Sequence, residues 1–243
     1  RPMLHLAMPV LAEQLLTMLV GYVDWWLTGH FLEGTAYRAA IGLMAYILWV
    51  LPSMFSAVAI GATAMTARFV GSGDLRGAVR VANQAVLVGA IVSVLATVAV
   101  ALWGPLFVAA MQLKEDAAPL AAEYLWILVP VIPAIMIEQV GVACLRGAGD
   151  MVSGFVAKTI VNVLNISVSA ALVTGWGVFP ELGWKGLAIG TAVGYGTGGL
   201  IILMLLLRGR AGLRLSWADL KPDRQIIRRL LRIGLPGGVD VAV

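Results

Sequence analysis

The sequence predicts an all-α membrane protein, a six-transmembrane-helix lobe followed by the first residues of a seventh helix. Apolar residues make up 60% of the 243 residues and charged residues only 12%, against roughly 25% charged in an ordinary soluble domain. The apolar residues also gather in six long stretches, and a helix needs about 20 such residues to cross the hydrocarbon core. Because these few charged residues could not cover the surface of a soluble protein, we expect the chain to lie in a lipid bilayer.

The six apolar stretches are expected to be helices. They comprise residues 6–29, 39–67, 81–103, 119–145, 151–175 and 186–207. Lipid offers the backbone no hydrogen-bond partners, so a spanning segment is either a helix or a strand of a closed barrel. Barrel strands alternate apolar and polar residues over about ten positions, and these stretches do not. Residues 1–207 therefore form the predicted N-terminal six-helix membrane lobe.

Lysine and arginine are distributed unequally between the two ends of these helices. Assigning the loops to alternate sides from the N-terminus places fourteen of the 17 basic residues on the first side and three on the second. The positive-inside rule puts the first side, with the N-terminus, in the cytoplasm. Residues 208–232 are then a basic cytoplasmic linker that faces lipid headgroups, with a short amphipathic helix on the membrane at 226–231, and not a nucleic-acid arm.

Two short echoes indicate internal repetition. Residues 71–74 read Gly-Ser-Gly-Asp and residues 147–150 read Gly-Ala-Gly-Asp. Glycine ends helices in the left-handed conformation and aspartate caps the next helix, so both are predicted to be turns, without catalytic roles. The entry to the first helix, residues 4–12, also resembles residues 231–239 in its leucine, its proline and its apolar pattern. We therefore expect residues 233–243 to begin the seventh helix, in a C-terminal lobe that the sequence leaves out.

Polar side chains within the apolar stretches are the candidate functional residues, because a charge at membrane depth costs about 2.5–3.5 kcal/mol on insertion scales. Asp24 lies deep in the first stretch, and Glu13 lies three helical turns before it on nearly the same face. Asn162, Asn165 and Ser169 follow the spacing i, i+3, i+7 and share one helix face. That face is predicted to look into the bundle, where its residues serve either a site or interhelical hydrogen bonds.

Glu138 and Lys158 are two further charges in the apolar stretches. Glu138 either supplies a second carboxylate to the site or lies near the cytoplasmic interface. Its pairing with Arg146, eight residues on and about 12 Å away at 1.5 Å per residue, would need both side chains extended. Lys158 is expected to extend to cytoplasmic water.

Glycines and prolines predict how the helices pack and bend. Gly186, Gly190, Gly194 and Gly198 recur every fourth residue, and such a ridge lets another backbone approach closely. Packing is preferred to ligand contact as their role. Three prolines, Pro52, Pro130 and Pro133, are expected to interrupt the second and fourth stretches and permit bends.

These motifs, in their order and spacing, resemble the multidrug and toxic compound extrusion (MATE) family along the whole chain. The matching features are Ala-Met-Pro at 7–9, Val23 and Asp24, Gly29, the turn at 71–74, Leu-Arg-Gly-Ala-Gly-Asp at 145–150, Asn165, and the run at 182–191 that ends in Thr191. The resemblance implies a twelve-helix, two-lobed transporter whose central cavity opens alternately inward and outward. It also implies secondary-active export of bulky, often cationic drug-like compounds in exchange for protons or sodium ions. The location it implies is the bacterial inner membrane, with a monomer at full length.

The resemblance also assigns roles to residues. Asp24 matches the helix-1 aspartate of the family's cation site, Asn165 matches its asparagine, and Thr191 matches its hydroxyl ligand. Ser169 stands where the family has a second aspartate, which leaves less negative charge to hold sodium. Asp24, Asn165, Ser169 and Thr191 are therefore the predicted cation- or proton-coupling residues, and Glu138 and Glu13 are possible additional carboxylates. A structural Asp24, satisfied by neighbouring backbone or hydroxyl groups, is the alternative.

Other functions find less support in the sequence. A lipid-linked oligosaccharide or polysaccharide flippase of the same broader group usually has a more cationic cavity, whereas the charges at membrane depth here are mainly acidic. The single cysteine, Cys144, and the two histidines, His5 and His30, supply no metal site. The sequence contains no nucleophile–base set and no phosphate-binding loop for ATP. We therefore expect a protein that is not an enzyme and has no cofactor beyond its coupling ion.

Overall fold

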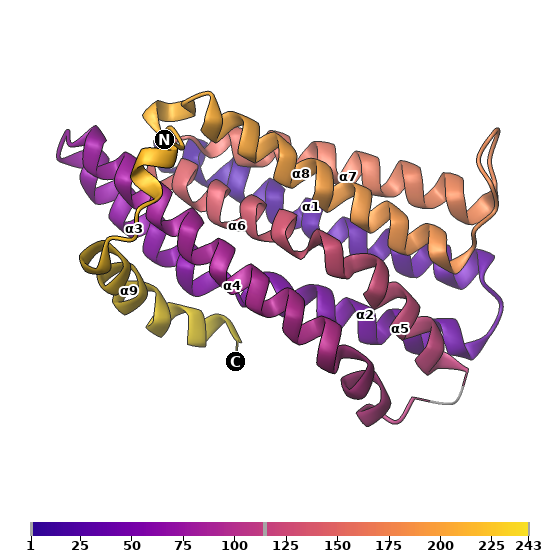
Figure 1. Ribbon diagram of the computed structural model, residues 1–243. Coiled ribbons are helices and arrows are strands. Elements are labelled where there is room, and N and C mark those ends of the chain that lie inside the picture. The colour runs from indigo at the N-terminus through magenta and orange to yellow at the C-terminus, as the bar shows by residue number, and fades with distance from the viewer. Residues whose placement is uncertain (1, 114–115, 243) are drawn as a thin grey trace.

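The computed structural model describes residues 2–113 and 116–242, and every regular element in them is a helix (Figure 1). The helices are α1 (Pro2–Phe31), α2 (Thr35–Ser53), α3 (Ser56–Gly71), α4 (Leu75–Ala110), α5 (Ala117–Leu128), α6 (Ile132–Gly147), α7 (Met151–Thr174), α8 (Trp184–Leu207) and α9 (Arg224–Ala242). Short 3₁₀ turns lie at η1 (Val129–Val131), η2 (Arg210–Gly212) and η3 (Trp217–Leu220). The all-α prediction is confirmed.

Five segments of the described chain are long and apolar enough to cross a membrane. They are Thr35–Gly71, Leu75–Ala110, Ala117–Gly147, Met151–Thr174 and Trp184–Leu207. They coincide with the second to sixth predicted stretches, whose ends differ by a few residues. Helix α1 covers the first predicted stretch with 30 residues but is not one of the five, so its crossing of the membrane stays a prediction.

Prolines divide two of these segments, as the sequence predicts. Pro52 lies in the last turn of α2, which ends at Ser53, and α3 begins at Ser56 after a two-residue turn. Pro130 lies in the 3₁₀ turn η1 between α5 and α6, and Pro133 lies in the first turn of α6. Because proline has no N–H and its ring collides with the preceding turn, each segment bends there.

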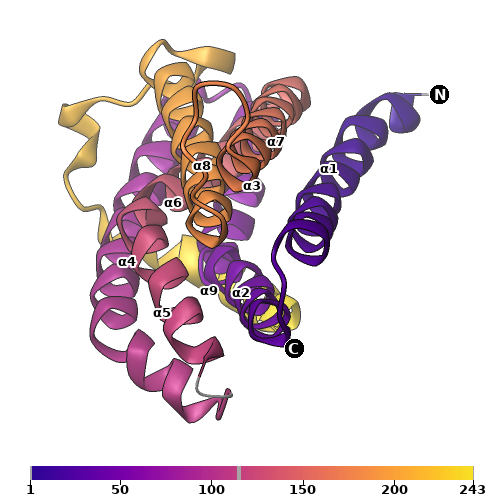
Figure 2. The same ribbon diagram turned by 90° about the vertical axis from the view of Figure 1, so that its right-hand side faces the viewer.

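Helices α7 and α8 lie side by side and form the most extensive packing contact of the lobe (Figures 1 and 2). The glycine ridge of α8 explains their closeness. A Cβ atom at Gly186 would lie 2.8 Å from the backbone of Leu172, and one at Gly194 would lie 3.1 Å from the carbonyl of Val161. The predicted packing role of the ridge is confirmed. Helix α1 lies at the edge of the bundle (Figure 2) and packs mainly against α7.

The two Gly-x-Gly-Asp turns adopt the same structure. Gly73 and Gly149 have φ values of 79° and 86°, which few residues other than glycine adopt. Asp74 accepts a hydrogen bond from the Gly77 N–H at 2.8 Å, and Asp150 accepts one from the Ser153 N–H at 3.0 Å. Both aspartates therefore cap the following helix, as predicted. The two turns lie at the same end of the lobe as the basic linker (Figure 1).

Two adjacent amide side chains of α4 hold the linker. Asn83 donates to the Arg214 carbonyl at 3.0 Å and accepts from the Ser216 N–H at 2.9 Å. Gln84 donates to the carbonyls of Asp219 and Lys221, both at 2.8 Å, and accepts from the Asp223 N–H at 2.9 Å. Both amides are buried, so they fix the path of the linker backbone across the end of α4.

Helix α9 corrects one expectation. It runs without a break from Arg224 to Ala242, so the predicted short surface helix at 226–231 and the predicted start of the seventh helix at 233 are one helix. Asp223 caps its start by accepting from the Gln225 N–H at 2.9 Å. The helix then packs against α3, where Gly61 meets the Leu230 carbonyl and Gly234 meets the Ala57 carbonyl. These two glycines let the backbones of α3 and α9 come into contact, so α9 packs closely along α3.

Candidate functional site

A cluster of buried polar side chains is formed by α1, α7 and α8, and α7 packs against each of the other two helices. Asp24 of α1 is 3% exposed, Asn165 and Ser169 of α7 are 2% and 0% exposed, and Thr191 of α8 is 1% exposed. All four are sequence-predicted coupling residues. Their burial confirms that the polar face of α7 looks into the bundle.

Hydrogen bonds join three helices at Thr191. The Asn165 side-chain N–H donates to Thr191 Oγ1 at 3.1 Å, and the Tyr124 hydroxyl of α5 lies 2.9 Å from the same oxygen. The carboxyl group of Asp24 lies close enough to the Tyr124 hydroxyl to interact with it electrostatically. Asp24 thus joins the cluster through its position on α1, which packs against α7.

Three oxygen atoms of the cluster form no hydrogen bond with the described protein: Asp24 Oδ1, Asn165 Oδ1 and Ser169 Oγ. Buried oxygens normally have a partner, because an unpaired one loses its interaction with water. A carboxylate, an amide oxygen and a hydroxyl are the ligands that hard monovalent and divalent cations prefer. These three oxygens are therefore the candidate ligands for a proton or a small cation.

The glycine ridge of α8 contributes directly to this geometry. A side chain at Gly190 would collide with the Ser169 hydroxyl and lie 2.7 Å from the Ser169 N–H. One at Gly194 would lie 3.1 Å from the Asn165 Cβ. Since α8 has no side chain at these positions, Thr191 comes within hydrogen-bonding distance of α7.

The other two predicted carboxylates lie outside this cluster. Glu138 forms an ion pair with Lys158 at 2.7 Å, and both side chains are buried. The expectation that Lys158 extends to cytoplasmic water is therefore wrong, because Lys158 and Glu138 each provide the charge that the other needs in the protein interior. The depth of Glu138 relative to the membrane interface stays a prediction. Glu13 forms an ion pair with Arg146 at 2.7 Å, so Arg146 is not the partner of Glu138.

Glu13 is separated from Asp24 by eleven residues, about 16 Å along a helix. Its carboxylate joins α1 to the last turn of α6, where Arg146 lies. The two acidic residues of α1 therefore belong to different sites, although they share a face.

Sequence reasoning missed two tyrosines. Tyr124 is fully buried and bonds Thr191, and the Tyr195 ring lies under the Lys158 ammonium at 5.4 Å from its centroid. A buried tyrosine hydroxyl usually finds a polar partner, so a tyrosine in an apolar stretch is itself a signal. Tyr195 also follows Thr191 by four residues, which places both on one face of α8.

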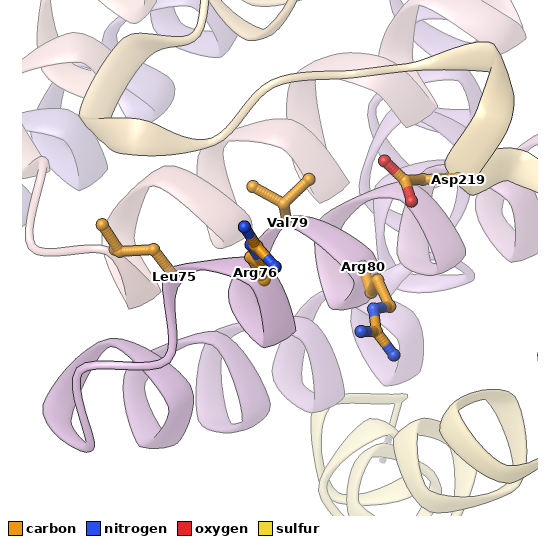
Figure 3. Close-up of a pocket in the computed structure, with 5 residues that line it drawn as sticks. All are labelled: Leu75, Arg76, Val79, Arg80 and Asp219. Carbon is orange, nitrogen blue, oxygen red and sulfur yellow. The ribbon is translucent and has the colours of Figure 1, made fainter.

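A pocket of ≈ 340 Å³ is unrelated to this cluster (Figure 3). It lies between the start of α4 and the linker. Its lining residues are Leu75, Arg76, Val79, Arg80 and Asp219. Its place at the linker end separates it from Asp24.

The fold and the buried polar cluster define a polytopic helical membrane protein in which buried polar groups mark the candidate site. The MatE family model matches residues 9–171, and the chain belongs to the MatE family.

Known proteins agree with this assignment. Probable multidrug resistance protein NorM of Thermotoga maritima is 27% identical over 240 residues, which cover 99% of this chain and 51% of that protein. An outward-facing multidrug resistance MATE family transporter of the MOP superfamily has a TM-score of 0.88 and 24% identity, over 98% of this chain and 51% of its own. An inward-facing multidrug resistance MATE family transporter of the MOP superfamily has a TM-score of 0.82 and 25% identity. The match covers 91% of this chain and 50% of that transporter. The chain thus spans about half the length of the relatives it matches.

Proposed function

We propose that this chain is the N-terminal lobe of a two-lobed secondary-active exporter, and that Asp24 couples export to the uptake of a proton or a sodium ion. The observation that carries the proposal is the buried carboxyl group of Asp24, which has no ion-pair partner among the described side chains. Family membership and the half-length match to multidrug transporters support the lobe assignment.

The proposed mechanism follows from the cost of burying a charge. An ionised Asp24 without a partner is unfavourable in the closed bundle, so a bound proton or cation stabilises the packed arrangement of α1 on α7. Loss of that ion favours access of water to the site. Ion occupancy therefore shifts the equilibrium between inward-open and outward-open states, because the two states bind the ion with different affinities.

The neighbouring oxygens define what the site accepts. Asn165 Oδ1 and Ser169 Oγ can complete the coordination of an ion held by Asp24, and Thr191 orients the Asn165 amide. A single carboxylate suits one monovalent ion and gives a divalent cation too little negative charge. The proposed transport substrates are drug-like organic compounds, often cationic, carried by a protein without enzymatic activity.

The proposed orientation places the linker end of the lobe in the cytoplasm. The linker, which is rich in arginine, and the two Gly-x-Gly-Asp turns lie together at that end, which supports the positive-inside assignment (Figure 1). We propose the bacterial inner membrane as the location and a monomer as the state of the two-lobed protein.

Gradient-driven export tests the proposal. The two-lobed transporter with Asp24→Asn, reconstituted in vesicles, is expected to lose drug export under an imposed proton or sodium gradient. Glu123→Gln is the matched control, because Glu123 is a partly exposed carboxylate paired with Lys185 at 2.8 Å. Undiminished export by Asp24→Asn under both gradients would refute the assignment.

A further inference from the structure

A buried ion pair lies on the same face of α7 as the Asp24 site. Glu138 of α6 and Lys158 of α7 are 2.7 Å apart, with side chains 4% and 10% exposed. Lys158 precedes Asn165 by seven residues, so it lies about 10 Å along the helix from the site. The Tyr195 ring of α8 lies 5.4 Å from the Lys158 ammonium, and Tyr195 follows Thr191 of the site by four residues.

The charges of the interior do not balance. Three charged residues are buried among the described side chains: Asp24, Glu138 and Lys158. Lys158 neutralises Glu138. Glu13, which also attracts Lys158, is neutralised by Arg146 at the edge of the bundle. When Asp24 is ionised, a net charge of minus one remains in the interior, and it resides on Asp24.

We propose that the lobe takes up a single monovalent cation, at Asp24, because Lys158 serves as a permanent counter-ion that occupies its second carboxylate, Glu138. This inference rests on the proposed coupling role of Asp24. The ammonium of Lys158 donates to Glu138 Oε1 and lies over the Tyr195 ring, which adds a favourable cation–π contact. Breaking such a pair leaves an uncompensated buried charge, so the ammonium stays in place during transport.

The surroundings of Glu138 indicate that Lys158 keeps a mobile proton or cation from binding to this carboxylate. Glu138 Oε2 makes no hydrogen bond with the described protein, and a Cβ atom at Gly198 would lie 3.2 Å from it. The Asn162 amide, one helical turn after Lys158, also has an unpaired N–H group. Without the ammonium, Glu138 would be a second buried carboxylate that requires a mobile proton or cation.

The number of cations exchanged per transported drug molecule distinguishes a lobe with one cation site from a lobe with two. Vesicles that contain the two-lobed transporter are brought to equilibrium with ethidium at zero membrane potential, under graded proton or sodium gradients. The slope of the logarithm of the ethidium ratio against the logarithm of the cation ratio gives the number of coupled cations. Lys158→Met, of similar length and without charge, is expected to raise the slope by one. Glu138→Gln combined with Lys158→Met is expected to restore the wild-type slope.

For each variant, one measured slope would overturn the inference. An unchanged slope in Lys158→Met overturns the inference, and so does a slope lowered by one in the double variant, because the pair would then have carried a coupled cation. If Lys158→Met does not fold, the charge-balanced double variant still gives this answer. Asp24→Asn is expected to lower the slope by one. An unchanged slope there would overturn the proposed function itself, whatever the pair does.

Discussion

The side chain of Asn165 donates a hydrogen bond to the hydroxyl of Thr191 at 3.1 Å, and this bond joins α7 to α8. The same hydroxyl lies 2.9 Å from the Tyr124 hydroxyl of α5. One threonine oxygen therefore holds together three helices. The candidate site and the packing of the lobe share this residue, so the two can be tested together.

Thr191→Val removes the shared oxygen while keeping the shape of the side chain. The Asn165 amide and the Tyr124 hydroxyl then lose a buried partner, and each buried polar group left unpaired costs about 1–3 kcal/mol. We expect the thermal unfolding midpoint in detergent to fall by several degrees. Thr97→Val is the control, because the Thr97 hydroxyl bonds the Ser93 carbonyl within its own helix. Equal losses in the two variants would contradict a bridging role for Thr191.

Gly190→Ala tests whether the glycine ridge sets the distance between α7 and α8. The added methyl group would collide with the Ser169 hydroxyl, so we expect a loss of stability of about 1–3 kcal/mol. Gly196→Ala is matched on the same helix, because a Cβ atom there meets nothing within 4 Å. That variant should be neutral or more stable by up to about 1 kcal/mol, since alanine favours helices. Thermal unfolding of both variants gives the comparison, and effects of the same sign would refute the prediction.

The sequence predicted the helices well because their spans depend on local hydropathy and their turns on local chemistry. Glycine before aspartate marked both caps, at Asp74 and Asp150, and prolines marked both bends. The polar face of α7 was equally readable, because a spacing of three and four residues places Asn162, Asn165 and Ser169 together whatever they contact. Each of these signals lies within one helix or turn.

Pairings between helices could not be predicted in the same way. Glu138 is closer in sequence to Arg146 than to Lys158, yet it pairs with Lys158, because α6 and α7 run antiparallel and bring the two side chains to one depth. The contacts of Asn83 and Gln84 leave no side-chain signal at all. Their partners are backbone groups more than 130 residues later. Every residue has the same backbone carbonyl, so the sequence does not indicate which one accepts the bond.

Gln84→Ala tests whether α4 holds the linker. The substitution removes three hydrogen bonds to the linker backbone, at Asp219, Lys221 and Asp223, each worth about 1 kcal/mol. We expect tryptic cleavage of the native protein between residues 208 and 224 to become about tenfold faster or more. Gln225→Ala is the control, because Gln225 is exposed at the start of α9. Cleavage at the wild-type rate in Gln84→Ala would show that the linker is held by other contacts.

Asp150 gives the lobe a stability that depends on pH. Burial raises the pKa of its carboxyl group, but hydrogen bonds from Ser153 and Arg210 outweigh the burial and hold the pKa below its ordinary value. The Arg210 Nε donates at 2.6 Å, which ties the linker to the turn before α7. Since the folded-state pKa is the lower one, the stabilisation is complete above the unfolded value of about 4 and disappears as the pH falls through the folded value.

Asp150→Asn keeps a capping side chain but removes this charge. At pH 7 we expect the variant to unfold about 1–3 °C below the wild-type protein, a small effect because Arg210 is about half exposed. The difference should shrink as the pH falls below about 4, where the wild-type carboxylate takes up its proton. Asp74→Asn, at the equivalent cap before α4, serves as the comparison. A difference between wild type and Asp150→Asn that stays constant from pH 7 to pH 3 would show that the ion pair with Arg210 contributes nothing, and that the cap alone stabilises the turn.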